Sequence, residues 1–437
     1  MKIVKMSLAA AVLVGASAFA IDNVKVSGNA QLFYGTSDAK GQTSNLIVGN
    51  TGSGTLFDKD SSTADAALNL NISADLAKNS LVTVSAGAGY TVLSTLGLEN
   101  NMVSNVWGGA HTASAGTGAS YGHALGGAKV ENANWMNEAW VALSLNQGSK
   151  STVKLGRMEL DTPLAFTEKW TIEKNTFEAG VLINQDIPDT TLVAAYVGNG
   201  NGTETFGQDS RSNVNTLGLA TAAVVNANGD FTTYGTDGAY AYGIINNSWK
   251  PLTAQAWYYD VSKVAQAYWL QADLNIAGVM AGAQYSGIDL SDFAGTSLTS
   301  NVYALELGYA MKDVFTAKVA YSEVNKDFAA GFNTATAMGT AQSKLYTEAW
   351  WNYGQVTAAG AKTWHAEVTS PVAGLFDAGL YVTSIDQLGT TPDVSEITVT
   401  AGKKFGPLDA TLAYISTAEN HGGIDSNIIQ AYLTLNF

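Results

Sequence analysis

The chain has 437 residues, of which 46% are hydrophobic and only 14% are charged, and its formal net charge is −15. Soluble domains usually carry about 25% charged residues, so this composition is atypical of a soluble enzyme. The acidic balance argues against a nucleic-acid partner, which requires clustered Lys and Arg, and the absence of cysteine excludes disulfides and thiolate metal sites.

The first twenty residues are predicted to be a cleaved signal peptide. Lys2 and Lys5 precede an apolar stretch over residues 6–15, and Ala18-Phe19-Ala20 has the A-x-A pattern of a cleavage site. A membrane-spanning helix needs about 20 apolar residues, and neither this stretch nor any later one is that long. We therefore expect residues 1–20 to direct export and residues 21–437 to form an outer-membrane β-barrel, as the following patterns indicate.

From residue 24 onward, apolar and polar residues alternate with a period of two. In residues 66–76, for example, Leu68, Leu70 and Ile72 alternate with Asn69 and Asn71. Successive side chains of a strand point to opposite faces, so each such segment has one apolar and one polar face. Strands of about ten residues with this pattern are typical of a transmembrane barrel, apolar toward lipid and polar toward a wet lumen. A soluble β-sandwich would have strands of about five or six residues.

Eighteen strands are predicted, joined alternately by short turns such as 78–79 and long connections such as 325–361. Outer-membrane barrels have an even number of antiparallel strands, with short periplasmic turns and longer outer loops, so the fold class is an all-β transmembrane antiparallel barrel with a water-filled lumen. A further strand over 345–353 would break the alternation, and we assign that segment to a long loop. The predicted strands are 24–36, 64–77, 80–93, 135–146, 150–157, 176–185, 190–198, 238–247, 252–260, 265–275, 277–287, 301–311, 314–324, 362–370, 374–386, 394–405, 407–417 and 427–437.

Aromatic residues recur at both ends of the predicted strands, on the apolar face. Because amphipathic rings prefer the headgroup level of a membrane, we expect two aromatic girdles. The chain also ends with apolar residues at alternate positions up to Phe437, which resembles the C-terminal signal read by the outer-membrane assembly machinery. The predicted outer girdle contains Tyr34, Tyr90, Tyr196, Tyr258, Tyr285, Tyr321 and Tyr414, and the inner one contains Tyr309, Phe315, Phe376, Phe405 and Phe437.

With these features, the chain resembles the major outer membrane porins of Campylobacter-type bacteria. The resemblance rests on the N-terminal sequence MKIVKMSLAAAVLVGASAFA and the VKVSG strand after it, on Leu155-Gly156-Arg157, and on the segment 190–195. It covers the whole chain in architecture, but in residues only the termini and positions 150–198. It implies an eighteen-stranded, water-filled and usually trimeric pore, and it leaves the preferred solute open.

The connection over residues 158–175 is predicted to fold into the barrel and to narrow it. Barrels of sixteen to eighteen strands leave an aqueous channel, and in a general pore the third long loop typically narrows it. Arg157 and Lys154, at the root of this loop, would either face its acidic groups across the opening or anchor it through a plain salt bridge. The alternative to an inward fold is that residues 158–175 form a solvated outer loop. The predicted constriction residues are Lys154, Arg157, Glu159, Asp161, Glu168, Lys169, Trp170 and Glu173.

Further ionisable residues fall on the polar faces of the predicted strands and are expected to line the lumen. Carboxylates outnumber lysines among them, and acidic linings concentrate cations, so a weak cation preference is predicted. The alternative is that these charges only solvate the lumen. The predicted lumen residues are Glu138, Asp273, Glu306, Lys318, Glu367 and Asp377, with Asp75, Asp409 and Lys25 in addition.

Catalysis has little support in the sequence. Of the four histidines only His365 lies on a predicted strand, and no nucleophile motif flanks any of them. Carboxylates near Asp58 offer oxygen ligands for Ca²⁺, but no loop spacing supports a site. We therefore expect a non-enzymatic porin without cofactor, a homotrimer in outer-membrane lipid, that passes ions and small hydrophilic solutes. A surface adhesin or structural barrel with a plugged lumen, and a substrate-selective channel, are the alternatives.

Overall fold

The computed structural model describes residues 21–38, 55–58, 62–94, 133–169, 172–201, 231–233, 237–290, 298–335, 341–420 and 425–437. The proposed signal peptide, residues 1–20, lies outside the described residues. In chain order the strands before residue 300 are β1 (Asp22–Ser37), β2 (Ser62–Lys78), β3 (Val82–Ser94), β4 (Ala133–Leu145), β5 (Ser151–Met158), β6 (Phe177–Asn184), β7 (Thr190–Gly200), β8 (Thr232–Thr233), β9 (Ala239–Asn246), β10 (Leu252–Val261), β11 (Ala265–Ile276), β12 (Val279–Asp289) and β13 (Thr299–Met311). The later elements are β14 (Phe315–Val324), the short helix α2 (Tyr353–Val356), β15 (Lys362–Val372), β16 (Phe376–Asp386), β17 (Val394–Phe405), β18 (Leu408–Glu419) and β19 (Ser426–Asn436).

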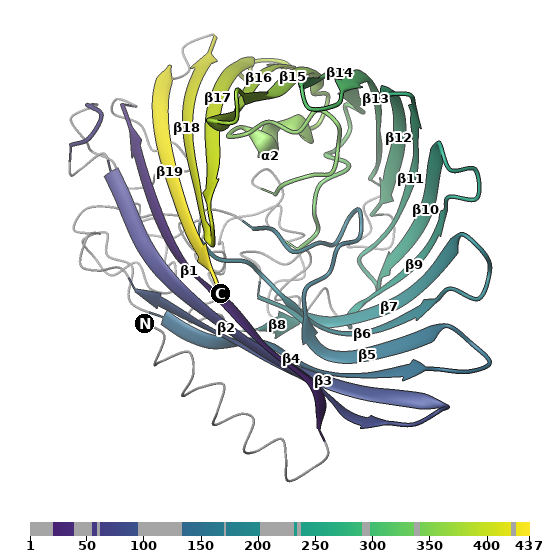
Figure 1. Cartoon of the computed structure of the whole chain (residues 1–437). Helices are drawn as coiled ribbons and strands as arrows, with labels where there is room; N and C mark the ends of the chain where they lie inside the picture. The colour runs from purple at the N-terminus through teal and green to yellow at the C-terminus, as the bar shows by residue number, and fades with distance from the viewer. Residues whose placement is uncertain are drawn as a thin grey trace.

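The strands form one antiparallel sheet that closes into a barrel (Figure 1). β1 pairs with both β2 and β19, so the first and last strands meet. β7 pairs directly with β9, and the two-residue β8 only pairs with the end of β7. The wall in the described chain therefore has eighteen strands, as predicted, with most ends close to the predicted ones. The segment 345–353 is not a wall strand.

The period-two pattern of the sequence separates an outward and an inward face along each strand. In β13, Leu305 and Leu307 are more than half exposed, whereas Val302 and Ala304 on the opposite face are fully buried. In register, Leu305 lies beside Ala283 and Tyr321, so one face runs continuously from strand to strand. Among the described residues, no helix is long and apolar enough to cross a membrane.

Tyrosines gather on the outward face, where they contact each other across neighbouring strands. The rings of Tyr268 and Tyr285 are 5.7 Å apart, and those of Tyr303 and Tyr321 are 6.1 Å apart. Several predicted members of the outer girdle are exposed, which suits rings at a lipid headgroup level: they are Tyr90, Tyr196, Tyr258, Tyr285 and Tyr414.

The seam between the two ends of the barrel depends on a glycine. Gly28 N donates to Phe437 O at 2.9 Å, and Phe437 N donates back to Gly28 O at 3.0 Å. A Cβ on Gly28 would lie 2.2 Å from the backbone oxygen of Asn69, and no side chain fits at that distance. The chain terminus thus completes the hydrogen-bonded ring.

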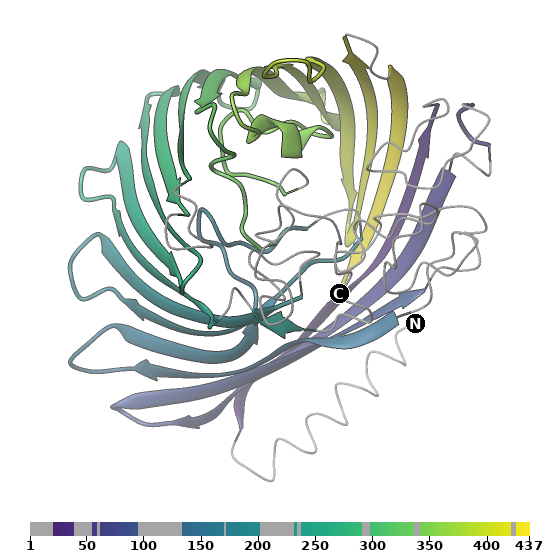
Figure 2. The ribbon, with the colours of Figure 1, turned by 180° about the vertical axis from the view of Figure 1, so that it is seen from behind.

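Two long connections lie inside the barrel. The first, residues 159–176 between β5 and β6, is called loop 3, and the second, residues 325–361 between β14 and β15, is called loop 7. Both run within the ring of strands in two opposite views, loop 3 in blue and loop 7 in green (Figures 1 and 2). Trp170, Thr171 and residues 336–340 within them are outside the described residues.

Candidate functional site

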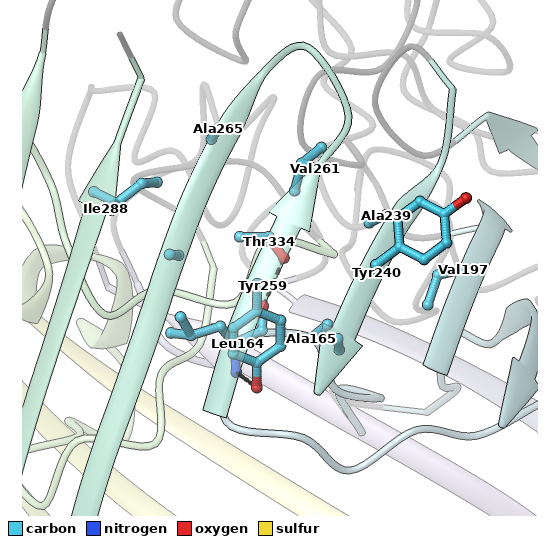
Figure 3. A pocket seen from close by; sticks show the side chains of 12 residues that line it. Leu164, Ala165, Val197, Ala239, Tyr240, Tyr259, Val261, Ala265, Ile288 and Thr334 are labelled. Atoms are coloured by element: carbon cyan, nitrogen blue, oxygen red, sulfur yellow. Dashed lines mark hydrogen bonds between the residues drawn. The ribbon is translucent and has the colours of Figure 1, made fainter. Parts of the chain in front are cut away.

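The tip of loop 3 sits on an apolar patch of the inner wall. Leu164 and Ala165 are buried against small side chains of β9 and β11, among them Ala239 and Ala265 (Figure 3). Alanines on the wall let the loop backbone approach closely, and Leu164 N donates to the hydroxyl of Tyr259 at 3.3 Å. The remaining space is a cavity of about 20 Å³, so the packing is nearly complete. Burying a leucine side chain contributes roughly 1.5–3 kcal/mol, which favours the inward position of the loop.

Loop 3 is also hydrogen-bonded to loop 7. The buried Asn333 side chain accepts from Phe166 N at 3.1 Å and donates to Phe166 O at 2.9 Å. Thr334 donates to Leu164 O through both its amide, at 2.9 Å, and its hydroxyl, at 2.6 Å. The two loops therefore form one unit inside the barrel, although about 170 residues separate the bonded positions.

Two of the predicted constriction charges are buried, one between loops 3 and 7 and one against the wall, and do not face open lumen. Glu168 accepts from Asn333 Nδ2 at 2.8 Å and from the amide of Gln342 at 2.9 Å. Glu173 accepts from Asn69 Nδ2 at 2.8 Å, inside an amide and hydroxyl network of β2, β3 and β4. Burial raises the pKa of Glu173 to about 7, against the opposing effect of the Asn69 hydrogen bond. These carboxylates hold the loop in place, which corrects their expected role as pore-facing charges.

The remaining loop 3 charges form an ionic cluster with β4 and β5. Lys174 pairs with Glu138 at 3.4 Å and with Glu159, while Glu159 also pairs with Lys169 at 3.1 Å. Lys154 lies over the Trp140 ring, 4.2 Å from its centroid. Burial opposes ionisation of Glu159, but Lys174 and Lys169 outweigh it and hold its pKa below the usual range. The structure thus brings together four predicted residues, Glu138, Lys154, Glu159 and Lys169, around Lys174.

Arg157 does not belong to this cluster, contrary to expectation. Its Nε donates to Glu178 Oε1 at 2.8 Å, and Nη1 donates to Met136 O at 2.9 Å. Its register partner is Ala139, and the residue two positions before it, Leu155, is exposed on the outward face. The side chain therefore shares the outward face, and the predicted approach of Arg157 to the loop's acidic groups is wrong. Arg157 is three residues after Lys154 on the same strand, so the period-two pattern of the sequence already places the two side chains on opposite faces.

A second charged group lies halfway around the ring, because β14 and β15 are opposite β4 and β5 in the strand order. Lys318 pairs with Glu306 at 3.5 Å and with Glu367 at 3.2 Å. Asp273 accepts from the hydroxyl of Tyr346 of loop 7 at 2.5 Å and from Gln271 at 2.8 Å. We call Asp273, Glu306, Lys318 and Glu367 the acidic wall.

The other predicted residues are dispersed. Asp161 is exposed and pairs with Lys344 of loop 7. Asp377 is exposed at the start of β16, where its register partner is Pro371 of β15. His365 is buried, with Nδ1 2.9 Å from the Thr383 hydroxyl, while His111, His123 and His421 lie outside the described residues. Among the residues that the structure describes, no group of three or more acidic or histidine side chains is arranged to hold a metal ion.

Sequence reasoning missed loop 7 as a part of this site. Its path along the wall is set by Tyr346 and by Trp350, whose Nε1 donates to Gln430 at 3.1 Å. The available signal was compositional: the segment 345–353 contains two Tyr and two Trp, which is unusual for a loop in water.

Solved structures of Pseudomonas aeruginosa proteins share this fold. OccK1 (OpdK) superposes with a TM-score of 0.68 at 13% identity, over 95% of this chain and 98% of that chain. OccK9 (OpdG) superposes with a TM-score of 0.67 at 14% identity, over 95% and 99%. OccK8 (OprE) gives 0.66 at 14%, over 95% and 98%. At these identities the similarity concerns the fold. No protein-family model matches the chain, and no curated protein matches it by sequence.

Proposed function

We propose that the protein is an outer-membrane channel for passive diffusion of ions and small hydrophilic solutes. The observation that carries this proposal is a closed eighteen-stranded barrel whose inward face bears partly exposed ionisable side chains. Barrels of this size leave an aqueous channel. Loops 3 and 7 narrow the channel without any chemistry, cofactor or metal. One solved neighbour is the outer membrane protein OpdK, which supports the same location here.

A modest preference for cations is part of the proposal. The acidic wall has three carboxylates, those of Asp273, Glu306 and Glu367, and a single lysine, Lys318, which pairs with the two glutamates. Across the lumen, the cluster around Lys174 is nearly balanced, with three lysines and two glutamates. Linings of one sign concentrate the opposite ion, so the acidic wall should dominate.

Single-channel recording in planar lipid bilayers tests the proposal. A general channel gives a large, steady conductance that rises in proportion to salt concentration. A barrel plugged by its loops, as in an adhesin or a structural barrel, gives no conductance, and that result would reject the proposal.

A substrate-selective channel is the second candidate. It is favoured by the two loops being fixed to each other, because a rigid opening with lysines on one side and carboxylates on the other discriminates by shape and charge. The related fold of OpdK has been solved with vanillate. Saturation of the current by a small organic solute would favour this candidate over the general channel.

The cellular setting is proposed on the sequence features. Residues 1–20 would direct export, Phe437 would be read by the assembly machinery, and the mature chain would form a homotrimer like the Campylobacter-type porins it resembles. Phe437 completes the seam with Gly28, which supports a requirement for an intact C-terminus. N-terminal sequencing of outer-membrane fractions should begin at Ile21, and native mass determination should give the trimer.

A further inference from the structure

Loop 7 follows a fixed path across the lumen, from β12 to β19. Gln284 on β12 accepts from the amide of Tyr346 at 3.1 Å and donates to Lys344 O at 2.8 Å. The hydroxyls of Ser322 on β14 and Thr347 lie 2.6 Å apart. These bonds position the first part of the loop on one side of the barrel.

A single wall carboxylate positions the second part. Glu396 on β17 is 2% exposed. Its oxygens accept from three consecutive backbone amides, those of Trp350 at 2.9 Å, Trp351 at 3.1 Å and Asn352 at 2.8 Å. The side chain of Asn352 adds a fourth donor at 2.8 Å and also donates to Thr417 on β18 at 2.9 Å. Hydrogen bonds from backbone amides to a carboxylate are about twice as strong as neutral ones, so these four bonds attach the loop firmly to the wall.

The attachment matters because burying a carboxylate is costly unless donors surround it. The wall strand itself contributes one donor to Glu396, the hydroxyl of Thr398 at 3.3 Å. Loop 7 supplies the three backbone amides and the Asn352 side chain. The loop that buries Glu396 therefore also supplies most of the donors that its carboxylate needs.

The loop carries aromatic side chains over the lumen wall. The Trp350 ring lies 5.6 Å from that of Tyr381 on β16, and the Tyr346 hydroxyl reaches Asp273 of the acidic wall. The position of residues 344–352 consequently determines how much of the lumen stays open beside that wall.

We propose that Glu396 is a positioning residue that holds loop 7 as a second constriction element, and so sets the width of the pore. The proposal rests on the proposed channel function. Loop 7 could narrow the pore or only stabilise the barrel. If it only stabilised the barrel, weakening its attachment would leave conductance unchanged.

Replacing the carboxylate tests this role. Glu396→Gln keeps the size of the side chain but removes the charge and turns one acceptor into a donor that faces other donors. We expect single-channel conductance to rise about twofold and to become noisier, because the narrowest segment limits the flow of ions. Asn352→Ala weakens the same attachment from the loop side and should give the same change. Heat-modifiable gel mobility shows whether Glu396→Gln folds. If it does not fold, Asn352→Ala replaces it as the test variant.

Glu367→Gln is the matched control. It removes one lumen carboxylate whose partners are Lys318 and His365, both on wall strands, so it leaves the attachment of loop 7 intact. It should therefore lower cation preference without raising conductance. Folded Glu396→Gln and Asn352→Ala channels with wild-type conductance would overturn the proposal.

A reversible tether gives an independent test, since the chain contains no cysteine. Ser322→Cys with Thr347→Cys places two thiols where two hydroxyls already touch. In the Glu396→Gln background, oxidation should restore wild-type conductance, and dithiothreitol should abolish the restoration. A tether without effect on conductance would contradict the role of loop position.

If wild-type barrels do not conduct but Glu396→Gln barrels do, the passive channel is rejected while Glu396 remains the residue that holds the loop closed.

Discussion

At the scale of single residues, burial decides which charges an ion would meet in the proposed channel. Glu168 and Glu173 are buried and enclosed by amide donors, so these two residues mainly fix loop 3. Glu306 and Glu367 remain partly exposed on the wall. Charge that is still in contact with lumen water acts on ions, whereas buried and paired charge acts on the fold.

Ion selectivity should therefore follow the acidic wall. We expect Glu306→Gln combined with Glu367→Gln to lower the ratio of potassium to chloride permeability, measured from reversal potentials in a KCl gradient. Glu323→Gln is the matched control, because Glu323 lies on the outward face, where the hydroxyls of Tyr303 and Tyr321 bind it. Fields from that face are screened within about 8 Å at physiological salt. Equal effects of the inner and outer variants would contradict the assignment.

Glu173 makes the stability of the folded barrel depend on pH. Its pKa rises from 4.5 in the unfolded chain to about 7 in the fold, so the neutral form is favoured by folding. The associated stability is fully present below pH 4.5 and is lost as the pH rises through about 7. Glu173→Gln mimics the neutral form and should stabilise the barrel at pH 8 by on the order of 3 kcal/mol, with little effect at about pH 4.

The temperature at which heat-modifiable gel mobility is lost measures this effect at both pH values. Glu159→Gln is the control and should have the opposite effect on stability. Neighbouring lysines hold the pKa of Glu159 low, so this residue stabilises the fold only above the pKa that it has in the unfolded chain. That variant should be less stable than the wild type at about pH 8. A Glu173→Gln barrel that melts like the wild type at both pH values would argue against the raised pKa of Glu173.

At the scale of elements, strands and loops differ in how far the sequence predicts them. The strands were predictable because alternation is local: each residue's face depends on its neighbours two positions away. The loop contacts depend on partners far along the chain, such as Asn69 for Glu173 and Asn333 for Phe166. No local pattern encodes such a pairing. The sequence therefore predicted that loop 3 is distinctive, but not which of its charges would be buried.

Removing part of loop 3 should show whether it limits the pore. Deleting Leu164 to Ile172 removes its apolar seat and its bonds to Asn333 and Thr334, so conductance should rise clearly. A deletion of similar length from Ala113 to Gly122, in the second long connection and outside the described residues, is expected to leave conductance nearly unchanged. Recordings in lipid bilayers compare the conductance of the two variants. A rise in conductance only in the second variant would mean that the second long connection, not loop 3, limits the pore.

At the scale of the whole molecule, the barrel is closed, so every strand has one face toward the outside and one face toward the lumen. The ring has no free edge once Gly28 and Phe437 pair, so backbone groups are bonded from strand to strand around the wall in the described part of the chain. Such a wall is suited to lipid, which cannot satisfy unpaired amides. Its outward face is then restricted to apolar and aromatic side chains, while the inward face tolerates charge wherever water or a loop receives it.

Two neighbouring substitutions test this division directly. Leu270 and Gln271 lie next to each other near the middle of β11, Leu270 exposed on the outward face and Gln271 bonded to Asp273 on the inward face. Leu270→Arg places a charge near the bilayer midplane, which costs roughly 2–4 kcal/mol in a barrel, and should hinder assembly. Gln271→Arg adds the same side chain beside the carboxylate of Asp273 and should fold. Heat-modifiable gel mobility after refolding into lipid measures both, and Leu270→Ala separates the added charge from the lost leucine. Equal folding yields for the two arginine variants would mean that the outward and inward faces of β11 are assigned wrongly, and the lumen residues of the acidic wall with them.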